Sequence, residues 1–154
     1  MIPQKILVTL LTASAVALML GFRSPSSEAA ATRTDIVASP ADTTVTSQLN
    51  LTVGDRVAFE FIIINNSKKR VELRFPNGQT HDFFVLDSLG REVWRWSSGR
   101  MFTQVLQNKL LDANQVIAFQ DTWKNTNASG TFTAVARLSS GNYPLEQRAQ
   151  FVIP

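Results

Sequence analysis

His81 and Asp82 are the one adjacent pair in the sequence that joins a base to a carboxylate able to orient it. Acyl transfer also needs a nucleophile and an oxyanion hole within reach of that base. The chain has no Gly-x-Ser-x-Gly segment to present a serine. Neighbouring residues on a strand point to opposite faces, so the two side chains would not act together there. We therefore expect His81 to begin a strand and the chain not to be an enzyme.

Metal and cofactor chemistry would have few ligands in this chain. Its 154 residues include no cysteine and a single histidine, which excludes disulfide bonds, thiolate metal sites and a cysteine nucleophile. A calcium loop carries Asp or Asn at alternate positions and a bidentate carboxylate, and no loop of the sequence has that pattern. Glycine-rich phosphate loops are absent as well. The sequence thus predicts neither a metal nor another cofactor.

The segment 94–104 is the least ordinary part of the chain. Trp94 and Trp96 lie two residues apart, so a strand would present both on one face. Arginine lies between them and again at position 100, and arginine stacked on tryptophan would stiffen the segment. Met101 and Phe102 add apolar surface just beyond. This composition is compatible with a surface that binds a partner.

Two roles are open for these aromatic residues. Exposed, they would form a sugar-stacking platform or a hot spot for a protein partner. Buried, they would fill a core, which is the more common role of large aromatic side chains. If the segment is a surface, the residues predicted to contact a partner are Trp96, Ser98, Arg100, Met101 and Phe102, and those predicted to support them are Trp94, Arg95 and Gln104.

Apolar and polar residues alternate along most of the chain after residue 43, as in strands with one buried face. Val57, Phe59, Phe61 and Ile63, for example, share one face. Turn signals such as Pro-Asn-Gly at 76–78 separate these runs. Strands are predicted at 44–53, 56–64, 70–75, 81–87, 91–96, 115–123, 131–138 and 148–153, and the pattern is weaker at 100–111.

This count of about eight or nine strands, with no convincing helix among them, favours an all-β fold, an antiparallel β-sandwich with a barrel as the alternative. The length predicts one domain, at 44–154. Residues 32–43, rich in Thr, Asp, Ser, Pro and Ala, are expected to form a flexible lead-in. We expect this domain to be a monomer.

Residues 1–31 have the layout of a secretory signal peptide. Lys5 precedes the uncharged stretch 6–22, and the small residues 29–31 supply a cleavage site. The alternative is an uncleaved membrane anchor, because 17 apolar residues are the lower limit for a helix that crosses a bilayer. Threonine, serine and alanine dilute the apolar signal, which favours cleavage. The sequence therefore predicts an N-terminal signal helix and a secreted, envelope or periplasmic protein.

The charge pattern argues against a nucleic-acid partner. The formal net charge is +3, and it falls to +2 when residues 1–31 are removed. The densest basic run, 68–70, follows Asn65-Asn66-Ser67 and is typical of a solvated turn. Binding to nucleic acid needs many more clustered phosphate contacts. A membrane would be contacted only through an uncleaved signal segment.

Several segments resemble the BsuPI-type intracellular proteinase inhibitor family. They stand in the family's order and spacing at 75–79, 81–83, 87–97 and 101–104, and the similarity extends from about Leu49 to Ile153. Two departures are the turn 112–115, which replaces a Pro-Gly turn and in which Asn114 would take a positive φ, and Phe132, which replaces the usual Tyr. The resemblance implies a small immunoglobulin-like β-sandwich domain.

The resemblance also implies a function, because the family's namesake inhibits an intracellular subtilisin-like serine protease. A proteinaceous inhibitor of such a protease is therefore expected, and the predicted export places its partner outside the cytoplasm. Within 98–103, Arg100 and Met101 are the candidate specificity side chains of a substrate-like loop. The alternative is an exported, non-catalytic interaction module that binds an envelope polymer or a partner protein, since one fold carries many kinds of site.

Overall fold

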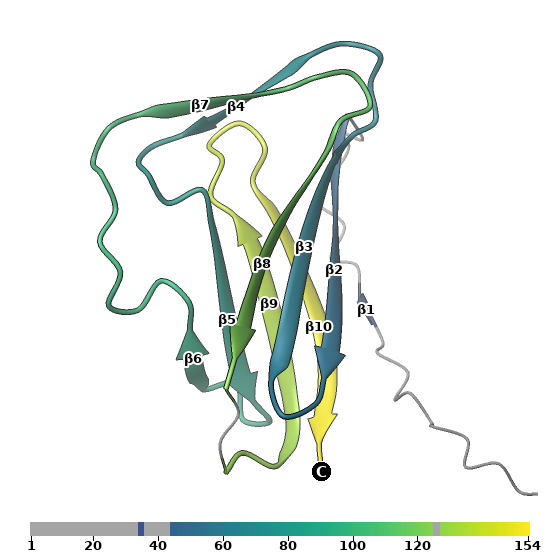
Figure 1. Cartoon of the computed structure of the whole chain (residues 1–154), viewed down its shortest axis with the longest axis vertical. Helices are drawn as coiled ribbons and strands as arrows, with labels where there is room; N and C mark the ends of the chain where they lie inside the picture. Colours follow the sequence, from purple (N-terminus) through teal and green to yellow (C-terminus); the bar gives the residue numbers. More distant parts are fainter. Residues whose placement is uncertain (1–33, 36–43, 125–126) are drawn as a thin grey trace, which may run out of the picture.

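The computed structural model describes residues 34–35, 44–124 and 127–154. These residues form an all-β structure (Figure 1). Its strands are β1 (Thr34–Asp35), β2 (Val45–Val53), β3 (Val57–Asn65), β4 (Val71–Phe75), β5 (His81–Asp87), β6 (Glu92–Arg95), β7 (Gln107–Leu111), β8 (Val116–Trp123), β9 (Gly130–Leu138) and β10 (Leu145–Ile153). The predicted signal helix and most of the predicted lead-in lie outside the described residues, and Thr34 pairs with Ala149 of β10.

The described strands pair antiparallel throughout, as predicted. One sheet has the order β1-β10-β9-β5-β6, a second the order β2-β3-β8, and β4 and β7 form a separate pair. In Figure 1 the second sheet lies in front of β5, β9 and β10, and the β4–β7 pair crosses the top of both. The two sheets keep separate edges, so the fold is a β-sandwich, as predicted, and not a barrel.

The core lies between the sheets because each strand sends its apolar face inward. β3 is the central strand of its sheet, and its alternate residues from Val57 to Ile63 are buried completely or nearly so. Phe83 of β5 faces them, with ring centroids 5.4 Å from Phe59 and 6.4 Å from Phe61. The other large, fully buried side chains are Val45, Leu73, Phe75, Val85, Leu111, Val135 and Leu138.

The predicted strands agree with the structure to within one residue at each end, apart from β10 and the segment 100–111. β10 begins at Leu145, three residues earlier than predicted, because an inward-facing Gln147 interrupts the apolar pattern; its amide is satisfied inside by Ser47 Oγ at 3.1 Å. β6 stops at Arg95, one residue earlier than predicted. Of the weakly patterned segment 100–111, only Gln107–Leu111 is a strand, β7.

The turn 112–115 between β7 and β8 takes the predicted conformation. Asn114 has a φ of 58°, a region that asparagine tolerates better than most residues. The backbone N–H of Asp112 donates to Gln115 Oε1 at 2.7 Å, and the N–H of Asn114 donates to the Ser67 carbonyl at 3.2 Å.

Within the described ranges, no helix has the length and hydropathy needed to cross a membrane.

Candidate interaction site

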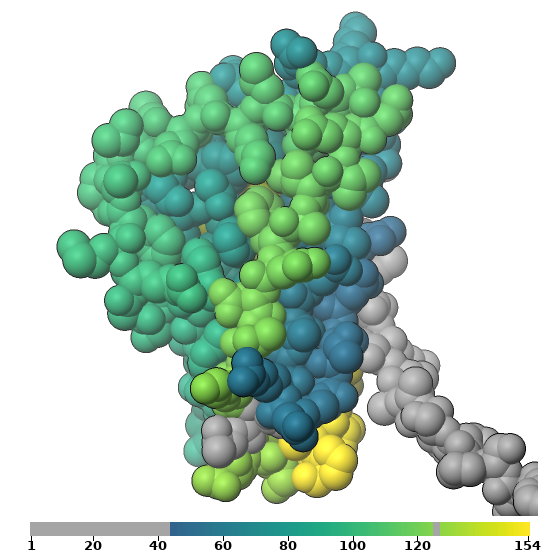
Figure 2. Space-filling view, viewed as in Figure 1, coloured from purple at the N-terminus to yellow at the C-terminus, as the bar shows by residue number. Residues whose placement is uncertain are grey.

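All the residues predicted to contact or support a partner lie on β6 or on the segment 96–106 that joins it to β7. In Figure 1 this segment runs up the left side of the molecule, from the end of β6 to the β4–β7 pair. Figure 2 shows it, in green at the left, forming the outer surface on that side. We call residues 96–106 the connecting loop. Its contacts decide which of its side chains are available to a partner.

The base of the loop is fixed by a buried carboxylate. Asp82 of β5 is 4% exposed and accepts hydrogen bonds from Ser97 Oγ at 2.8 Å and from the Ser97 N–H at 3.2 Å. Arg95 Nη1 donates to the same carboxylate at 2.7 Å. Buried carboxylates need such partners to offset the loss of hydration. Asp82, considered above as a partner of His81 in catalysis, thus has a structural role.

Arg95 supports the loop differently from the stacking that its position between two tryptophans suggested. Its guanidinium lies 4.4 Å from the centroid of the Phe84 ring, not over a tryptophan, and it also pairs with Glu92. Neighbours on a strand point to opposite faces, so Arg95 lies on the opposite side of β6 from Trp94 and Trp96. Arginine–tryptophan stacking occurs only at Arg100 in the described part of the loop.

The tryptophans pack into the molecule and do not form an exposed platform. Trp94 stacks on Phe59 with centroids 5.4 Å apart, and the centroid of Trp123 is 6.4 Å from that of Trp94. Trp123 is buried, and Trp94 and Trp96 are partly buried against the core. These contacts favour the packing role that the sequence left open for Trp94 and Trp96.

His81 lies between two aromatic rings and links the sheets to the loop. Its ring centroid is 4.4 Å from that of Trp96 in the loop and 4.2 Å from that of Phe119 on β8. Burial among these rings lowers the pKa of His81 to about 4, because the charged form loses hydration there. His81 is therefore neutral near pH 7 and serves as a packing residue.

Arg100 is held by three contacts within the molecule. Its Nε donates to the Trp96 carbonyl at 2.9 Å, and its guanidinium carbon lies 4.5 Å from the centroid of the Trp96 ring. Its Nη2 is 3.6 Å from Asp121 Oδ2 on β8. The predicted cation–π contact is confirmed. Arg100 fastens the loop to β8, although about half of its side chain remains exposed.

Phe102 and Met101 differ sharply in their surroundings. The Phe102 ring packs beside Trp96, with centroids 5.7 Å apart. Met101, between Phe102 and Arg100, is 99% exposed. Its two neighbours, Arg100 and Phe102, both contact Trp96, whereas the Met101 side chain projects into solvent. Met101 is the free tip of the loop.

The far side of the loop is fixed by main-chain contact with the turn after β4. The Gly78 N–H donates to the Thr103 carbonyl at 2.8 Å. A Cβ at Gly78 would lie 2.6 Å from Thr103 Oγ1, so the close approach depends on glycine. Gln104 Nε2 donates to the Phe102 carbonyl at 3.3 Å, and exposed Ser98 donates its N–H to the Arg95 carbonyl at 3.3 Å.

Sequence reasoning missed several residues that hold this site. They come from distant strands and turns, and no local pattern ties them to the loop: Gly78, His81, Asp82, Phe119 and Asp121. The Asn-Gly turn was recognised as a turn but not as a docking point. Val105 and Leu106, exposed by 67% and 77%, also extend the apolar surface beyond Met101.

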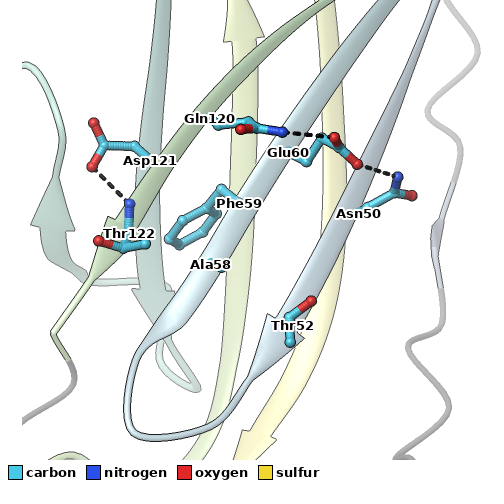
Figure 3. Close-up of a pocket in the computed structure, with 8 residues that line it drawn as sticks. All are labelled: Asn50, Thr52, Ala58, Phe59, Glu60, Gln120, Asp121 and Thr122. Carbon is cyan, nitrogen blue, oxygen red and sulfur yellow. Dashed lines mark hydrogen bonds between the residues drawn. The ribbon is translucent and has the colours of Figure 1, made fainter.

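A groove lies on the sheet formed by β2, β3 and β8 (Figure 3). It has a volume of about 580 Å³ and is lined by Asn50, Thr52, Ala58, Phe59, Glu60, Gln120, Asp121 and Thr122. Glu60 accepts hydrogen bonds from Asn50 Nδ2 at 3.0 Å and Gln120 Nε2 at 2.8 Å, and these bonds lower its pKa. Asn50, Glu60 and Gln120 thus form a row of hydrogen-bonded side chains across the three strands. No histidine is among its lining residues, and in the described parts of the chain no group of three His, Cys, Asp or Glu side chains could hold a metal ion.

Comparison with known proteins identifies the family. The intracellular proteinase inhibitor family, BsuPI, matches residues 44–143. The chain belongs to the BsuPI family. The match includes the whole connecting loop and the residues that anchor it, and it ends just before β10. The resemblance noted in the sequence is thereby confirmed.

The other comparisons do not extend the family assignment. No curated protein matches the chain. Among solved structures, the C-terminal domain of Wzt aligns with a TM-score of 0.43 and 13% identity, over 64% of this chain and 59% of that one. A β-glucosidase from Erythrobacter marinus aligns with a TM-score of 0.33 and 13% identity, over 66% of this chain and 15% of that one. The chain spans less than two thirds of either protein, and at these scores neither carries an argument.

Proposed function

We propose that this BsuPI-family chain is a proteinaceous inhibitor of a serine protease of the subtilisin-like class. The family description supports an inhibitor of a proteinase. The site that we propose is the connecting loop. The observation that supports it is that fully exposed Met101 lies between two residues that both contact Trp96. Such a loop offers a protease a segment whose shape is set before binding.

Rigidity is the physical requirement for inhibition by a substrate-like loop. A flexible segment loses conformational freedom on binding, which weakens the complex, whereas a preorganised segment avoids that cost. The connecting loop is tied to β5 through Asp82, to β8 through Arg100 and to the turn after β4 through Thr103. A protease–inhibitor interface buries about 800 Å² per partner, which a domain of this size can supply.

The proposal extends to where the inhibitor acts and to the finer class of its fold. We place its action outside the cytoplasm because residues 1–31 have the layout of a signal peptide, although the family is described as intracellular. The facing antiparallel sheets support an immunoglobulin-like sandwich. Fractionation of producing cells, with the protein detected by antibody, tests the location; a purely cytoplasmic signal would contradict export.

Inhibition itself is tested by titration. The purified protein is added to subtilisin, and hydrolysis of a chromogenic peptide is followed until it is steady. We expect hydrolysis to fall in a dose-dependent, saturable way while the added protein stays intact on a gel. Uninhibited hydrolysis across a panel of subtilisin-like proteases would reject the proposal. A change in tryptophan fluorescence with envelope polysaccharide would instead favour the alternative of a polymer-binding module.

A further inference from the structure

The sequence left two adjacent side chains, Arg100 and Met101, as candidates to enter the specificity pocket of a protease. Arg100 and Met101 would require different specificity pockets in the protease. Trypsin-like proteases bind a basic side chain through a carboxylate at the base of the pocket, and others present an apolar slot. Deciding between Arg100 and Met101 therefore decides which class of protease the loop can fit.

Arg100 is already committed to contacts inside the molecule. Its guanidinium carbon lies 4.5 Å from the Trp96 ring centroid, its Nε donates to the Trp96 carbonyl, and its Nη2 faces Asp121 at 3.6 Å. To enter a pocket it would have to give up all three contacts. Its release would also detach the loop from β8 and remove the preorganisation on which tight binding depends.

The Met101 side chain makes no comparable contacts within the molecule. It is 99% exposed, and its two neighbours are both packed on Trp96, so its side chain projects from a fixed backbone. Burying an exposed methionine in an apolar pocket is favourable because it removes apolar surface from water. Val105 and Leu106 add exposed apolar surface farther along the same loop, which favours a partner that is apolar around its pocket.

We propose that Met101 is the residue that enters the primary specificity pocket of the target, and that this pocket is a large apolar one. Arg100 is a positioning residue that holds the loop in shape through Trp96 and Asp121. This inference rests on the proposed inhibitory function and names the class of partner: a serine protease that cleaves after large apolar residues, not one that cleaves after arginine or lysine.

The test compares inhibition constants of the full chain and its variants against subtilisin and trypsin. Met101→Ala removes the pocket side chain, and we expect it to weaken inhibition of subtilisin by at least about tenfold. Met101→Arg should lose a similar factor against subtilisin and gain inhibition of trypsin. Leu89→Ala is the matched control, because Leu89 is an equally apolar side chain, 75% exposed, in the turn between β5 and β6. It should leave both inhibition constants unchanged.

The outcomes separate this inference from the function on which it rests. Met101 packs against nothing, so melting temperatures of its variants should match the wild type and exclude misfolding as the cause of lost inhibition. If the wild type inhibits subtilisin and Met101→Ala inhibits equally well, the specificity assignment is wrong while the inhibitory function stands. If the wild type prefers trypsin, the apolar pocket is wrong. If it inhibits neither protease, both proposals are overturned for these two classes.

Discussion

Asn65 lies at the end of β3 with no exposed surface and joins three stretches of main chain. Its Nδ2 donates to the carbonyls of Lys69, Leu111 and Asp112 at 2.8, 3.1 and 2.8 Å. Its Oδ1 accepts from the N–H and Oγ of Ser67. An asparagine can do this because one side chain carries both donors and an acceptor. The residue is therefore a structural link between β3, the turn after it and the end of β7.

We expect Asn65→Ala to lower the free energy of unfolding by about 2–4 kcal/mol, because a side chain with no exposed surface would be lost together with its hydrogen bonds to three carbonyls, of which that to Leu111 is buried. Urea unfolding followed by tryptophan fluorescence measures the change. Asn66→Ala is the control: Asn66 is exposed, with a side-chain hydrogen bond to Thr46 Oγ1 at 2.9 Å. Its effect should stay below about 1 kcal/mol. Equal losses from the two variants would show that the fold does not depend on the Asn65 hydrogen bonds.

The connecting loop behaves as an element although it is not a strand or a helix. Its shape comes from contacts at Trp96, Arg100 and Thr103, each with a different part of the sandwich. Segments that lack regular hydrogen bonding keep one conformation only when such contacts restrain them. The docking of Thr103 on Gly78 is the contact that a single methyl group would remove.

Gly78→Ala should loosen the loop without unfolding the domain. Its Cβ would meet Thr103 Oγ1 at 2.6 Å and the Thr103 nitrogen at 3.1 Å, so the Gly78–Thr103 hydrogen bond would be displaced. Hydrogen exchange measured by mass spectrometry should become faster across 100–104 and stay unchanged in β3. Gly141→Ala is the matched control, because its nearest contact would be an ordinary 3.8 Å to the Arg74 carbonyl. Unchanged exchange at 100–104 would show that other contacts hold the loop.

At the scale of the whole molecule, alternation in the sequence predicted most of the sandwich because most strands bury one face. It failed where tertiary contacts override that rule. Gln147 is polar yet faces inward, since Ser47 on another strand satisfies its amide, and β10 was consequently predicted too short. Segment composition identified the loop that carries the candidate site. It could not show that Arg100 is engaged and Met101 free, because both facts depend on Trp96, Asp121 and the path of the backbone.

His81 connects the two sheets and the connecting loop, so its protonation should affect the stability of the whole molecule. Burial lowers its pKa from 6.5 to about 4; among nearby charges, Asp82 and Asp121 raise the pKa, and Arg100 and Lys109 lower it. Between these two pH values the unfolded chain binds a proton that the folded chain does not. Stability therefore falls as the pH drops from about 6.5 toward 4 and is recovered as the pH rises.

We expect the melting temperature to decrease by a few degrees between pH 7 and pH 5, a window chosen to avoid the carboxylates. Asp87, Glu60 and Glu146 have pKa values lowered below those of the unfolded chain, so they lose their contribution only at lower pH. His81→Phe keeps a ring between Trp96 and Phe119 but cannot bind the proton, and its melting temperature should vary much less over this window. Calorimetry of both proteins at matched ionic strength measures the difference. If the melting temperatures of both proteins fall by the same amount, the pH dependence arises from other groups, and protonation of His81 does not affect stability.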